Sequence, residues 1–306
     1  MTVLLALIAA VFIGASDFIG GTVSRTRDPL ETSLVLFLAT VVTLVPFAAA
    51  LGASDLTWHD LGLGALAGIT TSVSYVGFFM AMGRGRMSIV APITAAVTAL
   101  LPAVAGLLDG NVLTALTLGG VLCALVSIPL VAYEAEDGHA TDAAAPVPDP
   151  AMGATPATAP DTPSAVTDWS TTRQVLVSVG CGVGFGVYFI CIGHTHRSSG
   201  LWPTVATLVV AIAITIPVAA RRGAMPAAST LSRLAVAAGL ALGIADAALT
   251  TALQRGPLTV ASVLGNLYPL VTIALGVAIL KERLRAWHVL GIALALTGVA
   301  MIAVGQ

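Results

Sequence analysis

Two carboxylates stand inside long apolar stretches of the chain, where an ionisable side chain is costly. Asp17 lies in the first stretch, several residues from its end, and Asp246 lies near the middle of the eighth. A charged side chain at the centre of a bilayer costs roughly 3 kcal/mol unless it is paired or faces water. Such residues typically mark a cavity or a proton path, because burial favours the neutral, protonated acid. We therefore predict a site for protons or a cationic group; hydrogen bonding between packed helices is the alternative.

Further polar side chains gather before a proline in the ninth apolar stretch. Asn266 and Tyr268 come just before or beside Pro269. A proline removes one backbone donor and frees a carbonyl one turn earlier, so we predict that both side chains line a substrate site. Packing or an interfacial position is the alternative. His194 and His196 stand two residues apart and do not share a helix face, so we expect an exposed loop there and no metal site.

The composition indicates whether water or lipid surrounds the chain. Of 306 residues, 57% are hydrophobic and 9% are charged, and the mean hydropathy is +0.98. Soluble domains usually carry about 25% charged residues, so we predict an all-α integral membrane protein. Strands of a barrel would alternate apolar and polar residues, whereas these stretches are apolar all round. A net charge of -2 gives no reason to expect nucleic acid as a partner, and no cofactor is predicted.

Ten stretches have about the length that a helix needs to cross a ~30 Å hydrocarbon layer. They are Thr2–Val23, Glu31–Leu51, Asp60–Gly83, Met87–Leu108, Leu113–Ala132, Arg173–Gly193, Leu201–Ala220, Leu231–Gln254, Pro257–Leu280 and Ala286–Gly305. Residues 133–172 are rich in Ala, Pro, Thr and Asp and cannot bury enough surface to fold, so we expect a disordered linker. It divides the chain into a first half, residues 1–132, and a second half, residues 173–306.

The two halves share a sequence pattern at one constant separation along the chain, equal to the separation between Gly68 and Gly239. We call this separation the repeat offset. Ala81–Gly85 falls on Ala252–Gly256, and Gly68 falls on Gly239 at the same offset without a gap. Because each half holds an odd number of spans, the second copy must insert upside down, and we predict two inverted five-helix repeats. Inverted repeats are typical of transporters, whose substrate site lies near the midplane where the halves meet.

The repeat associates two tyrosines with the acids. Tyr75 occupies in the third span the position that Asp246 occupies in the eighth, and Tyr188 falls close to Asp17. We predict that both tyrosines belong to the same substrate-binding or proton-coupling site as the acids. Packing between helices is again the alternative for each of them.

Lysine and arginine are unevenly distributed between the connections. Eleven lie in, or at the ends of spans bordering, connections that follow odd-numbered spans, whereas only Arg197 and Arg255 lie in connections that follow even-numbered spans. Cytoplasmic loops carry the excess of basic residues, so the odd-numbered connections and the linker are predicted to be cytoplasmic. Both termini then face outward.

Several short motifs accompany this pattern in both halves. They are Asn266-Leu-Tyr-Pro269, Gly276, Lys281-Glu282-Arg283-Leu284, Gly291 and Gly298 in the second half, and Gly14-Ala-Ser-Asp-Phe18, Ala91-Pro92-Ile93 and Pro102 in the first. Together they resemble the motifs of the EamA family, in the drug/metabolite transporter superfamily. The resemblance implies ten spans in two five-helix repeats and, against the charge count, cytoplasmic termini.

We predict a secondary transporter of the plasma membrane that works by alternating access of its two halves. The resemblance implies export of small organic solutes such as amino acids, metabolites or drugs, and protons are the candidate coupling ion. The chain has no G-x-x-x-x-G-K-[ST] phosphate-binding loop, so ATP is not expected to drive it directly. The expected partners are the solute, protons and the lipid bilayer.

Two other classes of function compete with transport. A membrane-embedded enzyme is disfavoured, because the chain has neither H-E-x-x-H nor G-x-S-x-G and no pair of aspartates on one span. A membrane scaffold or signalling protein would use the same fold without transport and would recruit a partner through the linker. This second alternative stays open.

Overall fold

The computed structural model describes residues 2–108, 114–116, 118–120, 122–123, 126, 169–226, 230–255, 265–280 and 286–304. Every regular element within these ranges is a helix, and no strand occurs in them. The predicted all-α class is therefore confirmed for this part of the chain. Most of the fifth predicted span, most of the predicted linker and the charged connection 281–285 lie outside it.

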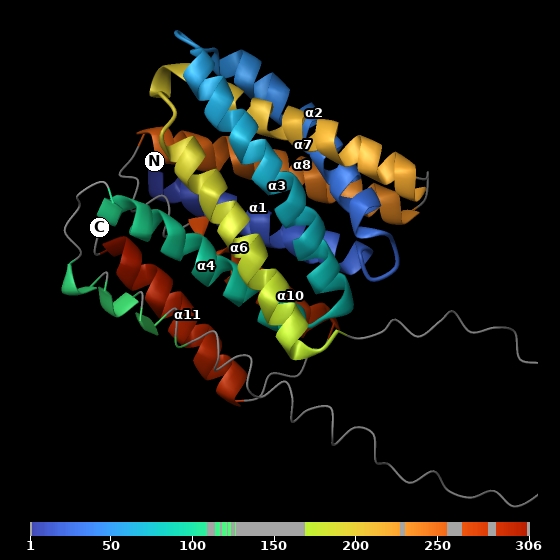
Figure 1. Ribbon diagram of the computed structural model, residues 1–306, viewed down its shortest axis with the longest axis vertical. Helices are drawn as coiled ribbons and strands as arrows, with labels where there is room; N and C mark the ends of the chain where they lie inside the picture. Colours follow the sequence, from blue (N-terminus) through green and yellow to red (C-terminus); the bar gives the residue numbers. More distant parts are fainter. Residues whose placement is uncertain are drawn as a thin grey trace, which may run out of the picture.

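The helices follow one another in a single bundle (Figure 1). They are α1 (Thr2–Val23), α2 (Pro29–Leu51), α3 (Trp58–Arg84), α4 (Met87–Leu108), α6 (Thr171–Gly193), the short 3-10 helix η1 (Arg197–Ser199), α7 (Trp202–Arg222), α8 (Thr230–Arg255), α10 (Tyr268–Leu280) and α11 (Ala286–Val304). Six of them are long and apolar enough to cross a membrane, namely α1, α2, α3, α6, α7 and α8. The bundle is that of an integral membrane protein.

Helices α2 and α3 begin earlier than hydropathy predicts, because capping residues extend them into polar sequence. The side chain of Asp28 caps α2, which begins at Pro29. Thr57 caps α3, which begins at Trp58, and its Oγ1 accepts a hydrogen bond from Asp60 N at 3.2 Å. Aspartate and threonine are favoured at this position because they satisfy amide groups that have no partner within the helix.

The ninth predicted span, Pro257–Leu280, is not one continuous helix. Asn266 and Leu267 form a turn, and α10 begins after it at Tyr268. Pro269 therefore lies in the first turn of α10, where its missing amide removes no helical hydrogen bond. The break that the proline predicts is therefore present, and it falls just before Pro269. Residues 257–264 of this predicted span lie outside the described part of the chain.

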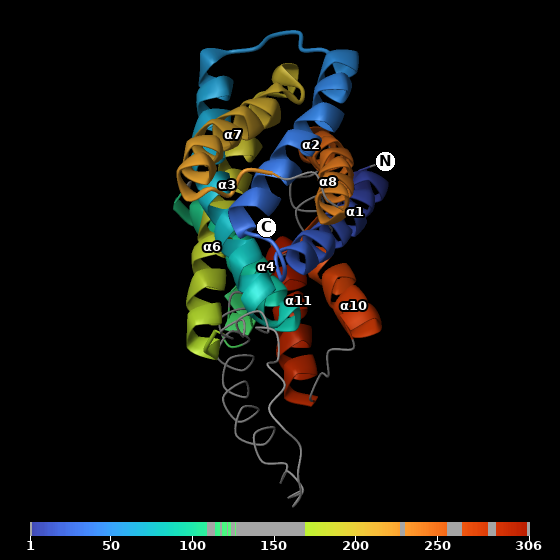
Figure 2. The same cartoon turned by 90° about the vertical axis from the view of Figure 1, so that its right-hand side faces the viewer.

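Helices of the first half pack against helices of the second half. α1 lies against α8 and α10, α2 against α7 and α8, α3 against α6 and α7, and α4 against α6 and α11. Figure 2 shows α7 beside α3, and α8 beside α1 and α2. The two halves therefore share one interior.

Close approach of the halves depends on glycines at matching places. A Cβ atom at Gly68 of α3 would lie 2.8 Å from Val210 Cβ of α7, and one at Gly239 of α8 would lie 2.6 Å from Ala39 Cβ of α2. Only glycine fits at such contacts, and small residues of this kind let helices pack closely in lipid. The repeat offset that carries Gly68 onto Gly239 also carries Ala39 onto Val210. The same helix contact thus occurs twice.

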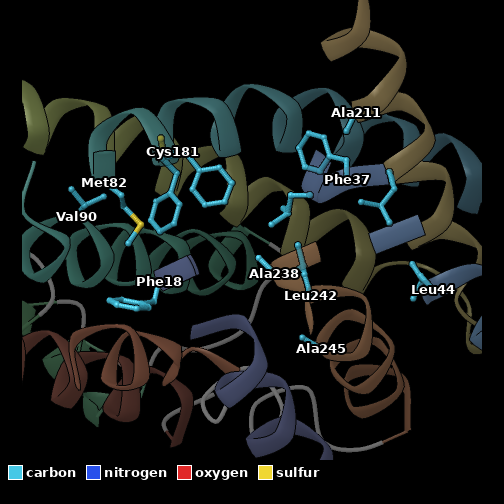
Figure 3. Packing of buried hydrophobic residues seen from close by; sticks show 14 of the residues in the cluster. Phe18, Phe37, Leu44, Met82, Val90, Cys181, Ala211, Ala238, Leu242 and Ala245 are labelled. Carbon is cyan, nitrogen blue, oxygen red and sulfur yellow. The ribbon is translucent and has the colours of Figure 1, made fainter. Parts of the chain in front are cut away.

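The shared interior is filled by apolar side chains from both halves (Figure 3). Phe37 of α2 and Met82 of α3 belong to one cluster with Cys181 of α6 and Leu242 of α8. All four side chains are buried. Cys181 serves here as a small hydrophobe, and all three cysteines of the chain are free thiols.

Candidate functional site

A cavity of about 70 Å³ lies where helices of the two halves meet. It can hold several water molecules, since each needs roughly 10–15 Å³ of such space. Aromatic and aliphatic side chains form most of the wall, and a smaller polar set is embedded in it. The lining residues are Ile13, Asp17, Thr71, Tyr75, Thr98, Phe185, Tyr188, Phe189, Thr204, Thr207, Leu208, Leu242, Asp246, Leu249 and Tyr268.

The structure brings together five of the six residues that the sequence predicts to bind substrate or protons. The five that line the cavity are Asp17, Tyr75, Tyr188, Asp246 and Tyr268. Asn266 is not among the lining residues. It is 3% exposed and belongs to the turn before α10, next to the helix that brings Tyr268 to the wall.

The two acids enter the cavity from opposite halves. Asp17 is on α1 and Asp246 is on α8, and these two helices pack side by side. Both carboxylates line the same cavity. Asp17 is 3% exposed, and within the described part of the chain its Oδ1 has no hydrogen-bond partner. A buried polar atom without a partner costs about 1–3 kcal/mol, so this oxygen is suited to a bound proton, water or ligand.

Threonine hydroxyls supply the rest of the polar wall, and none of them was predicted from the sequence. The four are Thr71, Thr98, Thr204 and Thr207. Thr207 Oγ1 donates to Gly64 O at 2.9 Å, whereas Thr71 Oγ1 is buried without a partner among the described residues. Thr71 lies four residues before Tyr75, and residues at this spacing share one helix face. That spacing is the signal that would have found it.

Hydroxyl groups and ring contacts surround the tyrosines in the wall. The hydroxyl of Tyr188 lies near the side chains of Thr204 and Thr250, whose own oxygens are 3.1 Å apart. Tyr75 stands edge-on to Phe185, with 4.9 Å between ring centroids. Aromatic pairs favour this geometry. The cavity therefore presents aromatic side chains that are already oriented before a ligand binds.

The acids and tyrosines occupy equivalent places in the two halves. The repeat offset carries Asp17 onto Tyr188, and it carries Tyr75 onto Asp246. All four line the cavity. The first half therefore contributes one acid and one tyrosine, from α1 and α3. The second half contributes the matching acid of α8 and tyrosine of α6, and Tyr268 of α10 is a further tyrosine with no acid partner at the repeat offset.

The cavity is chemically suited to a positive group. No lysine, arginine or histidine is among the described residues that line it. Carboxylates pair with ammonium groups or take up protons, and the faces of tyrosine and phenylalanine attract cations. The carboxylates and aromatic rings of the wall therefore favour binding of a proton, of an ammonium group, or of one after the other.

Hydrogen bonds join the two halves at one end of the bundle. The backbone amides of Ser54 and Asp55, between α2 and α3, donate to Ser198 O at 3.0 and 3.3 Å. Ser199 Oγ donates to the carboxylate of Asp60, which lies fully buried in the first turn of α3. We call these five residues the polar junction. It covers the end at which α6 finishes and α7 begins.

Two of three comparisons with known proteins gave matches. No curated protein matches the chain. A solved structure titled "Crystal structure of protein" matches with a TM-score of 0.64 and 16% identity, covering 98% of this chain and 96% of that chain, which shows a shared fold. The family model for EamA-like transporters matches residues 1–133 and 172–304, so the resemblance seen in the motifs is confirmed. The chain belongs to the EamA-like transporter family.

Proposed function

We propose that this protein is a secondary transporter that moves small organic solutes across a membrane by alternating access. One observation carries the proposal: Asp17 and Asp246 reach from opposite halves into one cavity that helices of both halves enclose. Transporters of this construction bind their solute near the midplane, between two units that move against each other. Membership of a transporter family supports the same function.

We propose two inverted five-helix repeats as the moving units. The contact of Gly68 with Val210 and its copy between Gly239 and Ala39 support this arrangement, because a twofold exchange of the halves converts one contact into the other. The placement of an acid and a tyrosine in each half supports it as well. Rocking of one unit against the other would open the cavity to each side in turn.

The start of α6 supports a fifth span in the first half. Gln174 of α6 accepts a hydrogen bond from Arg86 N, in the turn between α3 and α4, at 3.1 Å. α6 therefore begins at the end of the bundle where α4 also begins, whereas α4 finishes at the opposite end. One further crossing between them is what the predicted span Leu113–Ala132 provides.

The solute that fits this wall carries a cationic group, such as the ammonium group of an amino acid or of an amine-bearing drug or metabolite. A proton and an ammonium group would neutralise the same carboxylates, so the binding of one displaces the other. Exchange of this kind lets a proton gradient drive the solute in the opposite direction. Export across the plasma membrane is the direction and place that the family resemblance implies.

Transport by the purified full chain in proteoliposomes tests the proposal. Amine-bearing solutes, amino acids and neutral metabolites are offered with and without a proton gradient, and the wild type should move the amine-bearing solutes faster with the gradient. Asp246→Asn should lose the gradient dependence, because the amide cannot carry a proton. Asp55→Asn, which changes an exposed acid in the connection between α2 and α3, is the matched control and should transport as the wild type does.

The two parts of the proposal fail separately. A wild type that moves no solute of the panel contradicts transport of this solute class. Wild-type transport with the same gradient dependence in Asp246→Asn contradicts proton coupling through this carboxylate and leaves transport itself intact.

A further inference from the structure

A second group of polar side chains lies outside the cavity, beside the polar junction. His59 and Asp60 belong to the first turn of α3, and His196 lies in the connection between α6 and α7. Asp60 and His196 are separated by 136 residues along the chain. The bundle therefore brings together one carboxylate and two imidazoles from opposite halves.

The three side chains have the spacing of a tetrahedral metal site. Asp60 Oδ1 lies 3.0 Å from Nδ1 of His196 and 3.7 Å from Nδ1 of His59. One ligand atom from each residue falls within 4.8 Å of the others. Zinc binds nitrogen and oxygen ligands at about 2.0–2.1 Å, which puts two corners of its tetrahedron roughly 3.3 Å apart. The two measured distances lie on either side of that value.

The carboxylate is held in place by further hydrogen bonds. Asp60 is completely buried, and its Oδ2 accepts from Thr57 Oγ1 at 2.8 Å and from Ser199 Oγ. Outer partners of this kind orient a metal ligand and strengthen binding. His59 and His196 have side chains that are 64% and 60% exposed, so an ion can reach them from solvent and can keep a water molecule as its fourth ligand.

We propose that His59, Asp60 and His196 bind a divalent transition metal ion, with Zn²⁺ as the ion that fits best. Two imidazoles favour zinc and its neighbours over calcium and magnesium, which prefer oxygen ligands. The ion takes the place of the hydrogen that joins His196 Nδ1 to Asp60. It links α3 of the first half to the connection between α6 and α7 of the second half.

Binding of Zn²⁺ to the purified full chain, carrying no histidine tag, tests the site by calorimetric titration. The wild type should bind Zn²⁺ saturably. His59→Ala and His196→Ala should each weaken binding by about tenfold or more, the range found when even an outer partner of a metal site is lost. His194→Ala is the matched control: this histidine lies in the same connection and hydrogen-bonds through its ring to Ile190 O, and its loss should leave Zn²⁺ binding unchanged.

Thermal unfolding provides a second measurement of Zn²⁺ binding, which does not depend on the heats that detergent contributes to a calorimetric titration. Zn²⁺ should raise the unfolding temperature of the wild type and of His194→Ala, because a ligand that binds only the folded state stabilises it. It should not raise that of His59→Ala, whose exposed side chain can be removed without emptying the core. A wild type without saturable Zn²⁺ binding, or equal affinity in His59→Ala and the wild type, overturns the site.

A consequence for transport rests on the proposed function. Because the ion would join the two halves at the polar junction, Zn²⁺ should inhibit solute transport by the wild type and not by His59→Ala. Zn²⁺ binding without inhibition contradicts this consequence while the site stands. A wild type that binds Zn²⁺ but moves no solute contradicts the proposed function alone.

Discussion

Asp17 and Tyr188 face one cavity from equivalent positions on α1 and α6, related by the repeat offset. Tyr75 and Asp246 repeat this relationship on α3 and α8. Each half thus presents an acid and a tyrosine to the cavity in exchanged positions, and Tyr268 of α10 adds a third tyrosine. This exchange is what the proposed alternating access of two related halves requires.

Replacing Asp17 by asparagine should make the protein more stable and less active. Asp17 is buried in an apolar span, and its Oδ1 has no partner within the described residues. Removing the ionisable group should raise the free energy of unfolding, because a charged side chain at the centre of a bilayer costs roughly 3 kcal/mol. Thermal melts in detergent and transport assays on the same preparation measure the two effects.

Asp55→Asn is the control for both the thermal melt and the transport assay. Its side chain is exposed, so neither the melt nor transport should change. A lower unfolding temperature for Asp17→Asn would mean that the carboxylate holds α1 in the bundle, which is the packing alternative.

Alanine at Gly68 and at Gly239 should destabilise the protein to a similar degree. At each position the added methyl group would meet the facing helix, with Cβ atoms only 2.8 Å and 2.6 Å away. Overpacking of this kind typically costs about 1–3 kcal/mol. Gly62→Ala, also on α3, is the matched control, because nothing lies within 4 Å of a Cβ there. A response at only one of the two glycines would contradict the matched contacts of the halves.

Alanine at Ser199 should loosen the polar junction. The change removes the hydroxyl that donates to Asp60, and a hydrogen bond to a charged group contributes about 1.5–3 kcal/mol. The amides of Ser54 and Asp55 should then exchange with deuterium faster, because their bonds to Ser198 O form part of the same junction. Mass spectrometry of hydrogen exchange measures this.

Ser198→Ala is the control for that experiment, since it keeps the backbone oxygen that accepts both amides. Unchanged exchange in Ser199→Ala would mean that the backbone hydrogen bonds to Ser198 O hold the two connections together without the Asp60 side chain.

The sequence predicts best what is periodic or repeated. Apolar length predicts the helices from Thr2–Val23 to Ala286–Val304 closely, because burial in lipid leaves a continuous signal along the chain. The repeat offset relates Tyr75 to Asp246 and Asp17 to Tyr188, and all four of these predicted residues line the cavity. These features depend on residues near one another or on one constant offset.

The sequence predicts poorly what only the packed bundle brings together. Asp60 looks like a helix-capping acid, and His196 looks like a loop residue, until α3 and the connection after α6 meet. The sequence predicts a break near Pro269 but not that α10 begins at Tyr268, because a proline is compatible with both a kink and a helix start. Thr71 was missed because a small hydroxyl in an apolar helix has the same appearance whether it packs or lines a cavity.

A reporter fused after Gln306 should show that the C-terminus faces outward. Only Arg197 and Arg255 lie in the connections after even-numbered spans, and basic residues concentrate in cytoplasmic loops. A reporter that is active only outside the cytosol should therefore give signal, and a fluorescent reporter that matures only in the cytosol should not. A cytosolic signal would contradict the charge count and support the inside termini that the family resemblance implies.

Replacing residues 138–168 with a Gly/Ser segment of equal length should leave transport unchanged. The family model matches residues 1–133 and 172–304, on either side of this segment, so the proposed transporting units should not require it. The replacement stops short of Trp169, whose ring lies 4.2 Å from the Arg173 guanidinium and whose amide donates to Arg84 O at 3.3 Å. Proteoliposome transport by the variant and the wild type, at equal protein content, measures the effect. A different result would favour the scaffold alternative: neither the wild type nor the variant transports solute, and only the variant fails to bind a partner protein. That alternative assigns partner binding to this segment.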